Sequence, residues 1–260
     1  MKNFNLIGEN TSKSLSPYIH NFVFNEMGIN ATYKAISIED TSHFKTIIKN
    51  IRLGEIGGIN ITNPYKINAI KYLDKLDQSS SVIGAVNCVS LKDGSIYGHN
   101  TDWFGFKQML LSAKINFDDK NIKIIGYGGA ALAVKYAFEI MGVKKIEFYN
   151  RKNIGFNLLE LPDTLDDQSI VINATPYHFI ENDLEILEKF KRTKLVWIDL
   201  LYTKLSTLKY KELDKNRYFY GLDMLIYQAL ASIDIWFRKD ISKSVDLNDL
   251  KKYLKEVVDA

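Results

Sequence analysis

The fold of this chain is decided by one stretch, Asn121-Ile122-Lys123-Ile124-Ile125-Gly126-Tyr127-Gly128-Gly129-Ala130-Ala131. Its first five residues are largely apolar, which is typical of a buried strand. The turn then has the Gly-x-Gly-x-x-Ala pattern, and a helical pattern follows it. Gly126 permits the tight turn, Gly128 lets the backbone approach a pyrophosphate, and Ala131 permits close helix–strand packing. The helix N-terminus would face the pyrophosphate. The predicted dinucleotide site is therefore Gly126, Gly128, Gly129, Ala130 and Ala131, and the alternative is a Gly-rich turn without a ligand.

The end of the next strand indicates which dinucleotide binds. The strand expected at 145–149 is followed by Asn150-Arg151-Lys152. An NAD site usually presents Asp or Glu here, which binds the ribose 2′-hydroxyl. Two cations and an amide suit a 2′-phosphate instead. We therefore predict that NADP binds at these three residues, and the alternative is an exposed basic turn.

Strands and helices alternate along the whole chain, which indicates an α/β fold. Ser16-Pro17 is expected to open a helix, with Ser16 as its cap, and Gly28 to end it. Asp93-Gly94 is expected to form the turn of a hairpin. The segment from Lys152 to Ser169 is short for a strand–helix unit, so we expect reduced helical cover there. Strands are expected at 4–8, 31–38, 57–62, 121–125, 145–149, 169–173 and 195–199, helices at 16–27, 41–52, 64–76, 103–113 and 131–142, and the hairpin at 86–98.

Composition excludes several classes of protein. Hydrophobic residues make up 46% and charged residues 25%, which is ordinary for a soluble globular enzyme. A net charge of +3 gives no electrostatic footprint for nucleic acid or a membrane surface. The single cysteine, Cys88, excludes an intramolecular disulfide and a Cys-rich metal site. No signal peptide or membrane-spanning run is visible, so we expect a cytoplasmic protein without a metal.

Two further runs carry candidate chemistry. Lys66 closes Asn60-Ile61-Thr62-Asn63-Pro64-Tyr65-Lys66, and Asp102 closes Gly98-His99-Asn100-Thr101-Asp102. An amine and a carboxylate that meet can hold a substrate hydroxyl and move its proton. An alcohol/ketone interconversion needs this equipment beside its hydride carrier. A lone lysine is more often a solvated surface residue, and His20 is interpreted as structural.

Taken together, these runs resemble the shikimate dehydrogenase family. They occur in the family's order and cover nearly the whole chain. Further matching runs are Ser14-Leu15-Ser16-Pro17-Tyr18-Ile19-His20-Asn21, Gly84-Ala85-Val86-Asn87, Asn173-Ala174-Thr175-Pro176, Asp199-Leu200-Leu201-Tyr202 and Gly221-Leu222-Asp223-Met224-Leu225-Ile226-Tyr227-Gln228-Ala229.

The resemblance implies a two-domain fold with the active site in the cleft between the domains. The mostly parallel α/β substrate domain would comprise residues 1–102 and 222–260, and the Rossmann-like NADP domain residues 103–221. The implied reaction is the NADPH-dependent, reversible reduction of 3-dehydroshikimate to shikimate in aromatic biosynthesis. The implied partner is this small molecule, and the chain would be a monomer or a homodimer.

The resemblance also implies roles for single residues. Lys66 and Asp102 would flank the reacting oxygen. Ser14 and Ser16, just before a helix N-terminus, suit the substrate carboxylate. Thr175 and Gly221 join the predicted cofactor residues. Hydroxyl-binding candidates are Asn60, Thr62, Asn87, Tyr202 and Gln228. For Asn60 a structural role weighs equally with substrate binding, and for Tyr202 it weighs nearly equally.

Two departures and two alternative functions stay open. Trp103 and His178 stand where the family commonly has glycine, which bears on cofactor affinity more than on substrate chemistry. One alternative is an NAD-linked paralogue that acts on quinate, shikimate or an amino-substituted ring. The other is a nucleotide-binding regulator that has lost catalysis. The intact Lys66 and Asp102 argue against the regulator.

Overall fold

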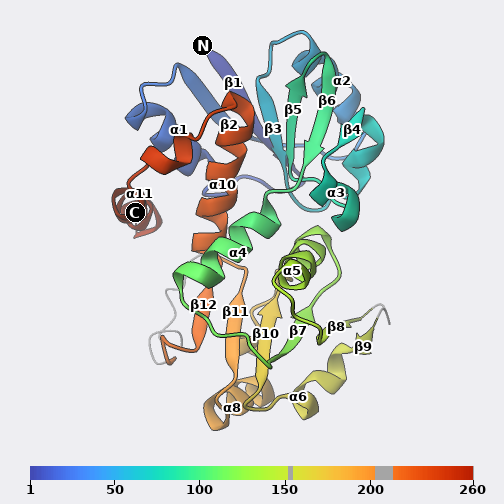
Figure 1. Cartoon of the computed structure of the whole chain (residues 1–260), viewed down its shortest axis with the longest axis vertical. Coiled ribbons are helices and arrows are strands. Elements are labelled where there is room, and N and C mark those ends of the chain that lie inside the picture. Colours follow the sequence, from blue (N-terminus) through green and yellow to red (C-terminus); the bar gives the residue numbers. More distant parts are fainter. Residues whose placement is uncertain (152–154, 203–212, 260) are drawn as a thin grey trace. The chain divides into compact units, whose positions relative to one another are not determined.

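The structure, a computed structural model, describes residues 1–151, 155–202 and 213–259 (Figure 1). The chain divides into two compact units. Unit 1 comprises Met1–Gly105 and Leu225–Ala260, and unit 2 comprises Phe106–Met224. Each unit is built on its own six-stranded sheet, so the predicted α/β fold with two sheets is confirmed. The assignment of substrate to 1–102 plus 222–260 and of cofactor to 103–221 stays a prediction.

The sheet of unit 1 is mixed, with the strand order β2-β1-β3-β5-β6-β4. The first three strands of the chain run parallel, and β5 and β6 form an antiparallel hairpin beside them. Asp93 and Gly94 both have positive φ, as a tight hairpin turn requires. The strands are β1 (Lys2–Gly8), β2 (Ala31–Ser37), β3 (Gly58–Ile61), β4 (Lys75–Leu76), β5 (Cys88–Lys92) and β6 (Ser95–His99).

Alternation along β1 supplies both faces of this sheet. Ile7 packs into a cluster with Phe44 of α2, whereas the ring of Phe4 stacks on Trp236 of α10 at 4.6 Å. The Trp236 indole also donates to the carbonyl of Val89 at 3.0 Å. The helices that contribute to unit 1 are α1 (Ser16–Glu26), α2 (His43–Arg52), η1 (Asn68–Tyr72), α3 (Gln78–Ile83), α4 (Asp102–Ser112), α10 (Leu222–Phe237), η3 (Ile241–Ser244) and α11 (Leu247–Asp259).

The helix expected over 64–76 is wrong. After a cis peptide bond between Asn63 and Pro64, the chain forms turns, the 3-10 helix η1 and then β4, which pairs with β6. The apolar residues recur every three positions, which matches 3.0 residues per turn rather than 3.6. The short helix α3 that follows was not predicted. Its cap is Asp77, whose Oδ1 accepts the N–H of Ser80 at 2.7 Å.

The sheet of unit 2 is fully parallel, with the order β12-β11-β10-β7-β8-β9. The central strands β7 and β10 span the predicted ranges because they are short apolar runs, buried on both faces. The strands are β7 (Asn121–Ile125), β8 (Ile146–Asn150), β9 (Phe156–Asn157), β10 (Ser169–Asn173), β11 (Val196–Asp199) and β12 (Tyr218–Tyr220).

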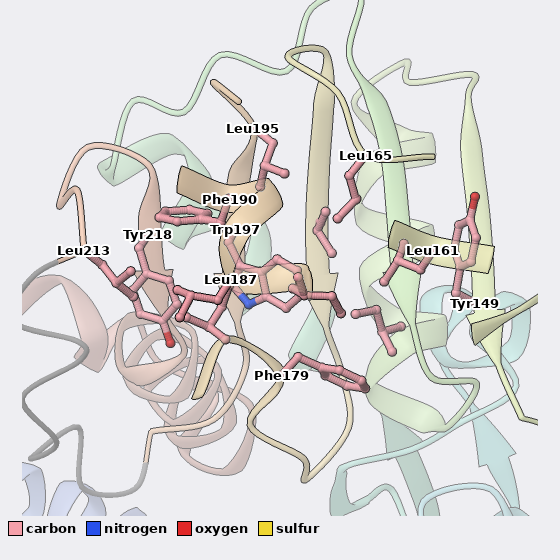
Figure 2. Packing of buried hydrophobic residues seen from close by; sticks show 14 residues of the cluster. Tyr149, Leu161, Leu165, Phe179, Leu187, Phe190, Leu195, Trp197, Leu213 and Tyr218 are labelled. Atoms are coloured by element: carbon pink, nitrogen blue, oxygen red, sulfur yellow. The ribbon is translucent and has the colours of Figure 1, made fainter. Parts of the chain in front are cut away.

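Helices cover both faces of this second sheet. Phe138 of α5 (Gly129–Ile140) packs edge-on against Phe106 of α4. Phe106 is the first residue of α4 that belongs to unit 2. On the other face, Trp197 is fully buried among side chains of the α7 and α8 region, including Phe179 and Leu187 (Figure 2). Between 155 and 169 the described residues form only β9, η2 (Leu158–Glu160) and the four-residue α6, which confirms the reduced helical cover. The remaining helices are α6 (Leu161–Thr164), α7 (Phe179–Asn182) and α8 (Leu184–Arg192).

Within the described residues, no helix combines the length and the apolar character that crossing a membrane requires.

Candidate active site

Unit 1 brings Lys66 and Asp102 together, as the sequence predicts. The Lys66 ammonium donates to Asp102 Oδ2 at 2.6 Å. Asp102 is the first residue of α4, and a carboxylate is favoured at a helix N-terminus. Its backbone N–H donates to Asn100 Oδ1 at 3.0 Å, which fixes the entry to the helix. The Lys66 side chain retains 16% exposure against 6% for Asp102, so the lysine is the more accessible member of the pair.

Asn87 holds the other oxygen of Asp102. Its Nδ2 donates to Asp102 Oδ1 at 2.8 Å and to Thr101 Oγ1 at 2.9 Å. Its Oδ1 accepts the backbone N–H of Thr101 at 2.6 Å. The two carboxylate oxygens of Asp102 are thus divided between an amide and an ammonium, and the carboxylate orientation is set by both.

The remaining hydroxyl-binding candidates of unit 1 differ in how many of their hydrogen-bonding groups already have partners in the protein. Asn60 donates both amide hydrogens, to Asn87 O and Ser232 Oγ, and accepts from the Tyr33 hydroxyl, each at 2.9 Å. Its side chain therefore links segments of the protein, and to bind a substrate it would have to exchange a partner. Gln228 donates to the carbonyl of Leu225 at 2.8 Å. Thr62 is half-buried just beyond β3.

The helix cap expected at Ser16 is not found at the start of α1. Ser16 is the first helical residue, and the cap position is held by Leu15, without a side-chain cap. Ser14 Oγ accepts the N–H of Ser16 at 3.2 Å, so Ser14 provides a partner for one of the first backbone N–H groups of the helix. The expectation that Ser16 caps the helix is wrong, because the turn begins one residue earlier than the Ser-Pro pattern suggests. Their role toward a substrate carboxylate stays a prediction.

His20 lies inside unit 1, and the structure supports its interpretation as structural. Its ring is fully buried and stacks on Tyr33, with centroids 3.9 Å apart. Burial lowers the pKa of His20 to about 3, and the nearby Asn60 side chain offsets part of this shift. The imidazole is therefore neutral at physiological pH.

A second polar chain supports the approach to Asp102. His99 Nε2 lies 3.0 Å from Ser90 Oγ, and His99 Nδ1 lies 3.2 Å from Asp77 Oδ2. Burial opposes ionisation of Asp77, but hydrogen bonds from His99 and Ser80 outweigh it and lower the pKa of Asp77 to about 2. The order Ser-His-Asp is that of a hydrolytic triad. Ser90, however, is buried on a sheet strand. The hydrogen bonds among Ser90, His99 and Asp77 instead anchor the end of β6. Residues Asn100 to Asp102 follow directly after this strand.

Sequence reasoning missed Ser232 and Tyr33 and assigned no role to Thr101. Ser232 is fully buried on α10, and its Oγ lies 3.2 Å from Thr101 Oγ1. It follows Gln228 by four residues, which places both on one face of the helix. That spacing was the available signal.

In unit 2 the Gly-rich turn has the geometry that a pyrophosphate needs. Gly126 has φ +106°, and its N–H donates to the carbonyl of Tyr149 on β8. A Cβ there would lie 3.0 Å from Thr175 Cγ2, so the ends of β7 and β10 adjoin at this turn. Strand order reverses between these two strands, and ligands of open α/β sheets bind at such a point.

Gly128 differs from Gly126, because a Cβ added to it would meet no atom within 4 Å. It precedes the first turn of α5, which has neither a side-chain cap nor an acidic residue. The first N–H groups of this helix therefore have no partner within the helix. Glycine at a position with room for a side chain fits the close approach of a ligand, and the donors there fit an anionic pyrophosphate.

The other predicted cofactor residues that the structure describes belong to unit 2, and Thr175 adjoins the turn. Asn150 is buried at the end of β8, and Arg151 is exposed after it. Lys152 lies outside the described residues. The Thr175 hydroxyl donates to Asn173 Oδ1 at 2.8 Å. A Cβ on Gly221 would lie 2.3 Å from the carbonyl oxygen of Leu200, so only glycine fits there.

Two further predictions concern the place of Tyr202 and the presence of a metal. Tyr202 belongs to unit 2 and is half-buried, so it is not part of the cluster within unit 1. Over the part of the chain that the structure describes, no group of three His, Cys, Asp or Glu side chains could hold a metal ion.

Comparison with known proteins shows which family the chain resembles. A family model described as the shikimate dehydrogenase substrate binding domain matches residues 6–89. The chain is 35% identical to a shikimate dehydrogenase (NADP(+)) of Staphylococcus aureus, over 95% of this chain and 96% of the relative. It is 33% identical to a protein of the same name from Clostridium perfringens, with the same coverage of 95% and 96%.

Solved structures give the same result. A shikimate dehydrogenase 1 from Peptoclostridium difficile has a TM-score of 0.81 at 31% identity, covering 98% of this chain and 97% of that one. A shikimate dehydrogenase in complex with NADP+ has a TM-score of 0.82 at 32% identity, covering 99% and 96%. One from Listeria monocytogenes in complex with shikimate and NAD has a TM-score of 0.79 at 27% identity, covering 98% and 96%. The family predicted from the sequence is thus confirmed, and the chain belongs to the shikimate dehydrogenases.

Proposed function

We propose that this chain catalyses the NADPH-dependent, reversible reduction of 3-dehydroshikimate to shikimate, a step of aromatic amino acid biosynthesis. The observation that carries the proposal is the 2.6 Å contact between Lys66 and Asp102 in a member of this family. Residues 1–102 and 222–260 would bind the substrate, and residues 103–221 the cofactor.

The pair can perform the proton transfer that the reaction requires. NADPH, when bound, supplies the hydride that reduces the ketone carbon. The carbonyl oxygen then needs a proton, and the Lys66 ammonium is a donor with some solvent access. Asp102 Oδ2 keeps the ammonium oriented, while Asn87 keeps Oδ1 in place. In the reverse direction, the same pair accepts the proton of the substrate hydroxyl.

Most candidate partners for the other substrate groups lie in unit 1. A carboxylate suits Ser14 and Ser16, where hydroxyls adjoin the first N–H groups of α1. Asn87 Nδ2 has two hydrogens, and its shorter contacts with Asp102 and Thr101 use both. Gln228 Oε1 lies 3.2 Å from Asn87 Nδ2 but receives neither of these hydrogens, so it is left to accept a substrate hydroxyl. Thr62, Asn60, Asn87 and Tyr202 stay proposed as further hydroxyl ligands.

Cofactor binding is proposed at the turn and at the end of β8. Gly126, Gly128, Gly129, Ala130 and Ala131 would hold the pyrophosphate. Arg151, exposed after β8, would meet the 2′-phosphate together with Asn150 and Lys152. Thr175 and Gly221 complete the proposed set.

Two other functions are weighed against this one. The absence of a carboxylate at the end of β8 argues against an NAD-linked paralogue that acts on quinate, shikimate or an aminoshikimate. The paired Lys66 and Asp102 argue against a non-catalytic regulator. We further propose a cytoplasmic monomer or homodimer that binds small molecules and neither nucleic acid nor membrane.

One assay separates the three functions. The initial rate of cofactor reduction is measured in four mixtures, which combine NADP+ or NAD+ with shikimate or quinate. We expect turnover with NADP+ and shikimate to exceed the other three. Preference for NAD+ or for quinate would favour the paralogue. No turnover in any mixture, with NADP+ binding retained in calorimetry, would favour the regulator.

A further inference from the structure

A closed ring of hydrogen bonds lies beside the Lys66–Asp102 pair. Its four members come from four different segments, and all are buried: Asn60 of β3, Asn87 before β5, Thr101 before α4 and Ser232 of α10. Asn60 Nδ2 contacts Ser232 Oγ and Asn87 O, each at 2.9 Å. Asn87 Nδ2 contacts Thr101 Oγ1 at 2.9 Å, and Thr101 Oγ1 lies 3.2 Å from Ser232 Oγ. We call these four residues the hydrogen-bond ring.

The donors and acceptors of the hydrogen-bond ring can be assigned by counting. Ser232 has one hydroxyl hydrogen, which it donates to the carbonyl of Gln228 at 3.0 Å, a usual contact for serine in a helix. Its oxygen then accepts from Asn60 and lies 3.2 Å from the Thr101 hydroxyl. The other acceptors near that hydroxyl are Asn87 Oδ1 at 3.2 Å and Gln228 Oε1 at 3.5 Å. Thr101 in turn accepts from Asn87. Ser232 is therefore the acceptor for the second amide hydrogen of Asn60, and its contact with Thr101 closes the hydrogen-bond ring.

Asp102 is attached to this hydrogen-bond ring at two points. It follows Thr101 in the chain, and its Oδ1 accepts from Asn87. Thr101 is held from both sides, since its backbone N–H donates to Asn87 Oδ1 and its hydroxyl reaches Ser232. A shift of Thr101 would thus move both the backbone of Asp102 and the amide that orients its carboxylate.

We propose that Ser232 is a positioning residue for the proton transfer: it closes the hydrogen-bond ring that fixes Asp102 relative to Lys66. This inference rests on the proposed dehydrogenase function. Ser232 itself is fully buried and would touch neither substrate nor cofactor. Removing its hydroxyl leaves the second amide hydrogen of Asn60 unpaired in a buried place, which the segment can relieve only by moving. The Thr101 hydroxyl is then left to Asn87 Oδ1 or Gln228 Oε1, so the hydrogen-bond ring opens.

The test compares steady-state kinetics of Ser232→Ala, Ser232→Cys and the wild type, with shikimate or whichever substrate the wild type turns over. We expect Ser232→Ala to lower kcat about 10- to 100-fold, because small displacements of reacting groups cost this much. The KM for substrate should stay within about 3-fold, since binding is largely preserved. Ser232→Cys keeps a side chain of similar size with a weak hydrogen-bonding sulfur, so it should fold readily and lose kcat as well.

A matched control is Ser169→Ala in unit 2. Ser169 is also buried, and its hydroxyl donates to Asp166 Oδ1 at 2.6 Å. It should cost stability without changing kcat. A Ser232→Ala variant whose kcat matches that of Ser169→Ala, or whose loss lies in KM alone, would overturn the positioning role.

A double-variant cycle shows whether Ser232 acts through Thr101. Thr101→Val removes the hydroxyl that contacts Ser232. The double variant should lose about as much kcat as the more damaged single variant, because members of one network are not additive. Losses that multiply would mean that Ser232 acts independently of the hydrogen-bond ring. Wild-type protein that turns over neither shikimate nor quinate would count against the proposed function, whereas an active wild type with an unaffected Ser232→Ala would count against this inference alone.

Discussion

The two carboxylate oxygens of Asp102 bind different partners, and the orientation of this carboxylate depends on both contacts. Oδ2 faces an ammonium and Oδ1 an amide, so neither oxygen is free to turn toward the other's partner. Lys66 and Asp102 were predictable because each closes a distinctive run. Ser232 was not predicted, because its one signal is the position four residues after Gln228 on the same helix face, and this spacing alone does not distinguish it from another buried serine.

At the residue scale, Lys66→Ala should lower kcat for shikimate oxidation by about 10²–10⁴, because a positioned proton-transfer group is lost. The KM for shikimate should change only a few-fold. The control is Lys71→Ala, which removes an exposed lysine of η1 and should leave the rate unchanged. Steady-state rates that are near normal for Lys66→Ala would remove this residue from the chemistry.

A second residue-scale prediction concerns stability toward acid. Above pH 6.5 His20 is neutral in both the folded and the unfolded chain. Below it, the unfolded chain binds a proton that folded His20, with a pKa of about 3, does not. The contribution of the neutral ring is therefore lost as the pH falls from 6.5 toward 3. Between pH 7 and pH 5 this amounts to about 2 kcal/mol of unfolding free energy.

The measurement is urea unfolding of the wild type and of His20→Phe, which keeps an aromatic ring against Tyr33 without an ionisable group. The stability of the variant should fall less steeply with acid. Burial raises the pKa of Asp199 to about 6, and this group acts in the opposite direction, so the difference between the two proteins isolates His20. Parallel pH profiles would show that His20 does not titrate as stated.

At the scale of elements, the start of α5 separates the demands of packing from those of binding. Gly128→Ala should leave the free protein as stable or up to about 1 kcal/mol more stable, because the backbone there is extended and nothing meets the new methyl. NADP+ should bind about 10-fold more weakly or worse, because the methyl occupies the approach to the first turn. Calorimetry with NADP+ and urea unfolding measure the two effects.

Gly126→Ala is the contrasting variant. With φ at +106°, any side chain strains the backbone, so this change should destabilise even the free protein. If Gly128→Ala bound NADP+ normally, the open space beside α5 would not be the pyrophosphate site.

The end of β8 is the element that should set cofactor preference. Arg151→Ala should raise the KM for NADP+ and leave that for NAD+ almost unchanged, since the 2′-phosphate is the only difference between them. The loss should shrink in high salt, because an exposed ion contact is screened. Arg192→Ala, which removes an exposed arginine of α8, is the control. An Arg151→Ala variant that weakens both cofactors alike would reject the assignment.

The elements also show where sequence patterns suffice. β7 and β10 were predicted to the residue because uniform apolar runs between turn residues leave little freedom in a parallel sheet. The segment after Pro64 was mistaken for an α-helix because its period of three was read as helical, and pairing of β4 with β6 is a long-range contact that no local pattern shows. The cap position expected at Ser16 falls on Leu15 for a similar reason, since a one-residue shift of a helix start is below the resolution of a capping pattern.

At the scale of the whole molecule, each ligand should protect its own unit. In hydrogen exchange measured by mass spectrometry, shikimate alone should slow exchange in peptides that contain 60–66 and 98–102. NADP+ alone should slow it in the peptide that contains 126–131. The reason is that a ligand suppresses the local openings of the segment it binds. Peptides from α2 serve as the internal control. Protection of 126–131 by shikimate alone, with 60–66 unchanged, would contradict the assignment of substrate to residues 1–102 and 222–260.

The hydrogen-bond ring also has a consequence in time. Its contact between Asn60 and Ser232 spans 172 positions of the sequence, and the whole of unit 2 is synthesised between its two ends. Contacts of such separation are late events in folding, because a long loop must close before they form. A nascent chain therefore carries Lys66 and Asp102 long before it carries α10, which completes their support. Catalytic competence should be among the last properties this protein gains on the ribosome, and an early-truncated copy would not be a slower enzyme but an unassembled one.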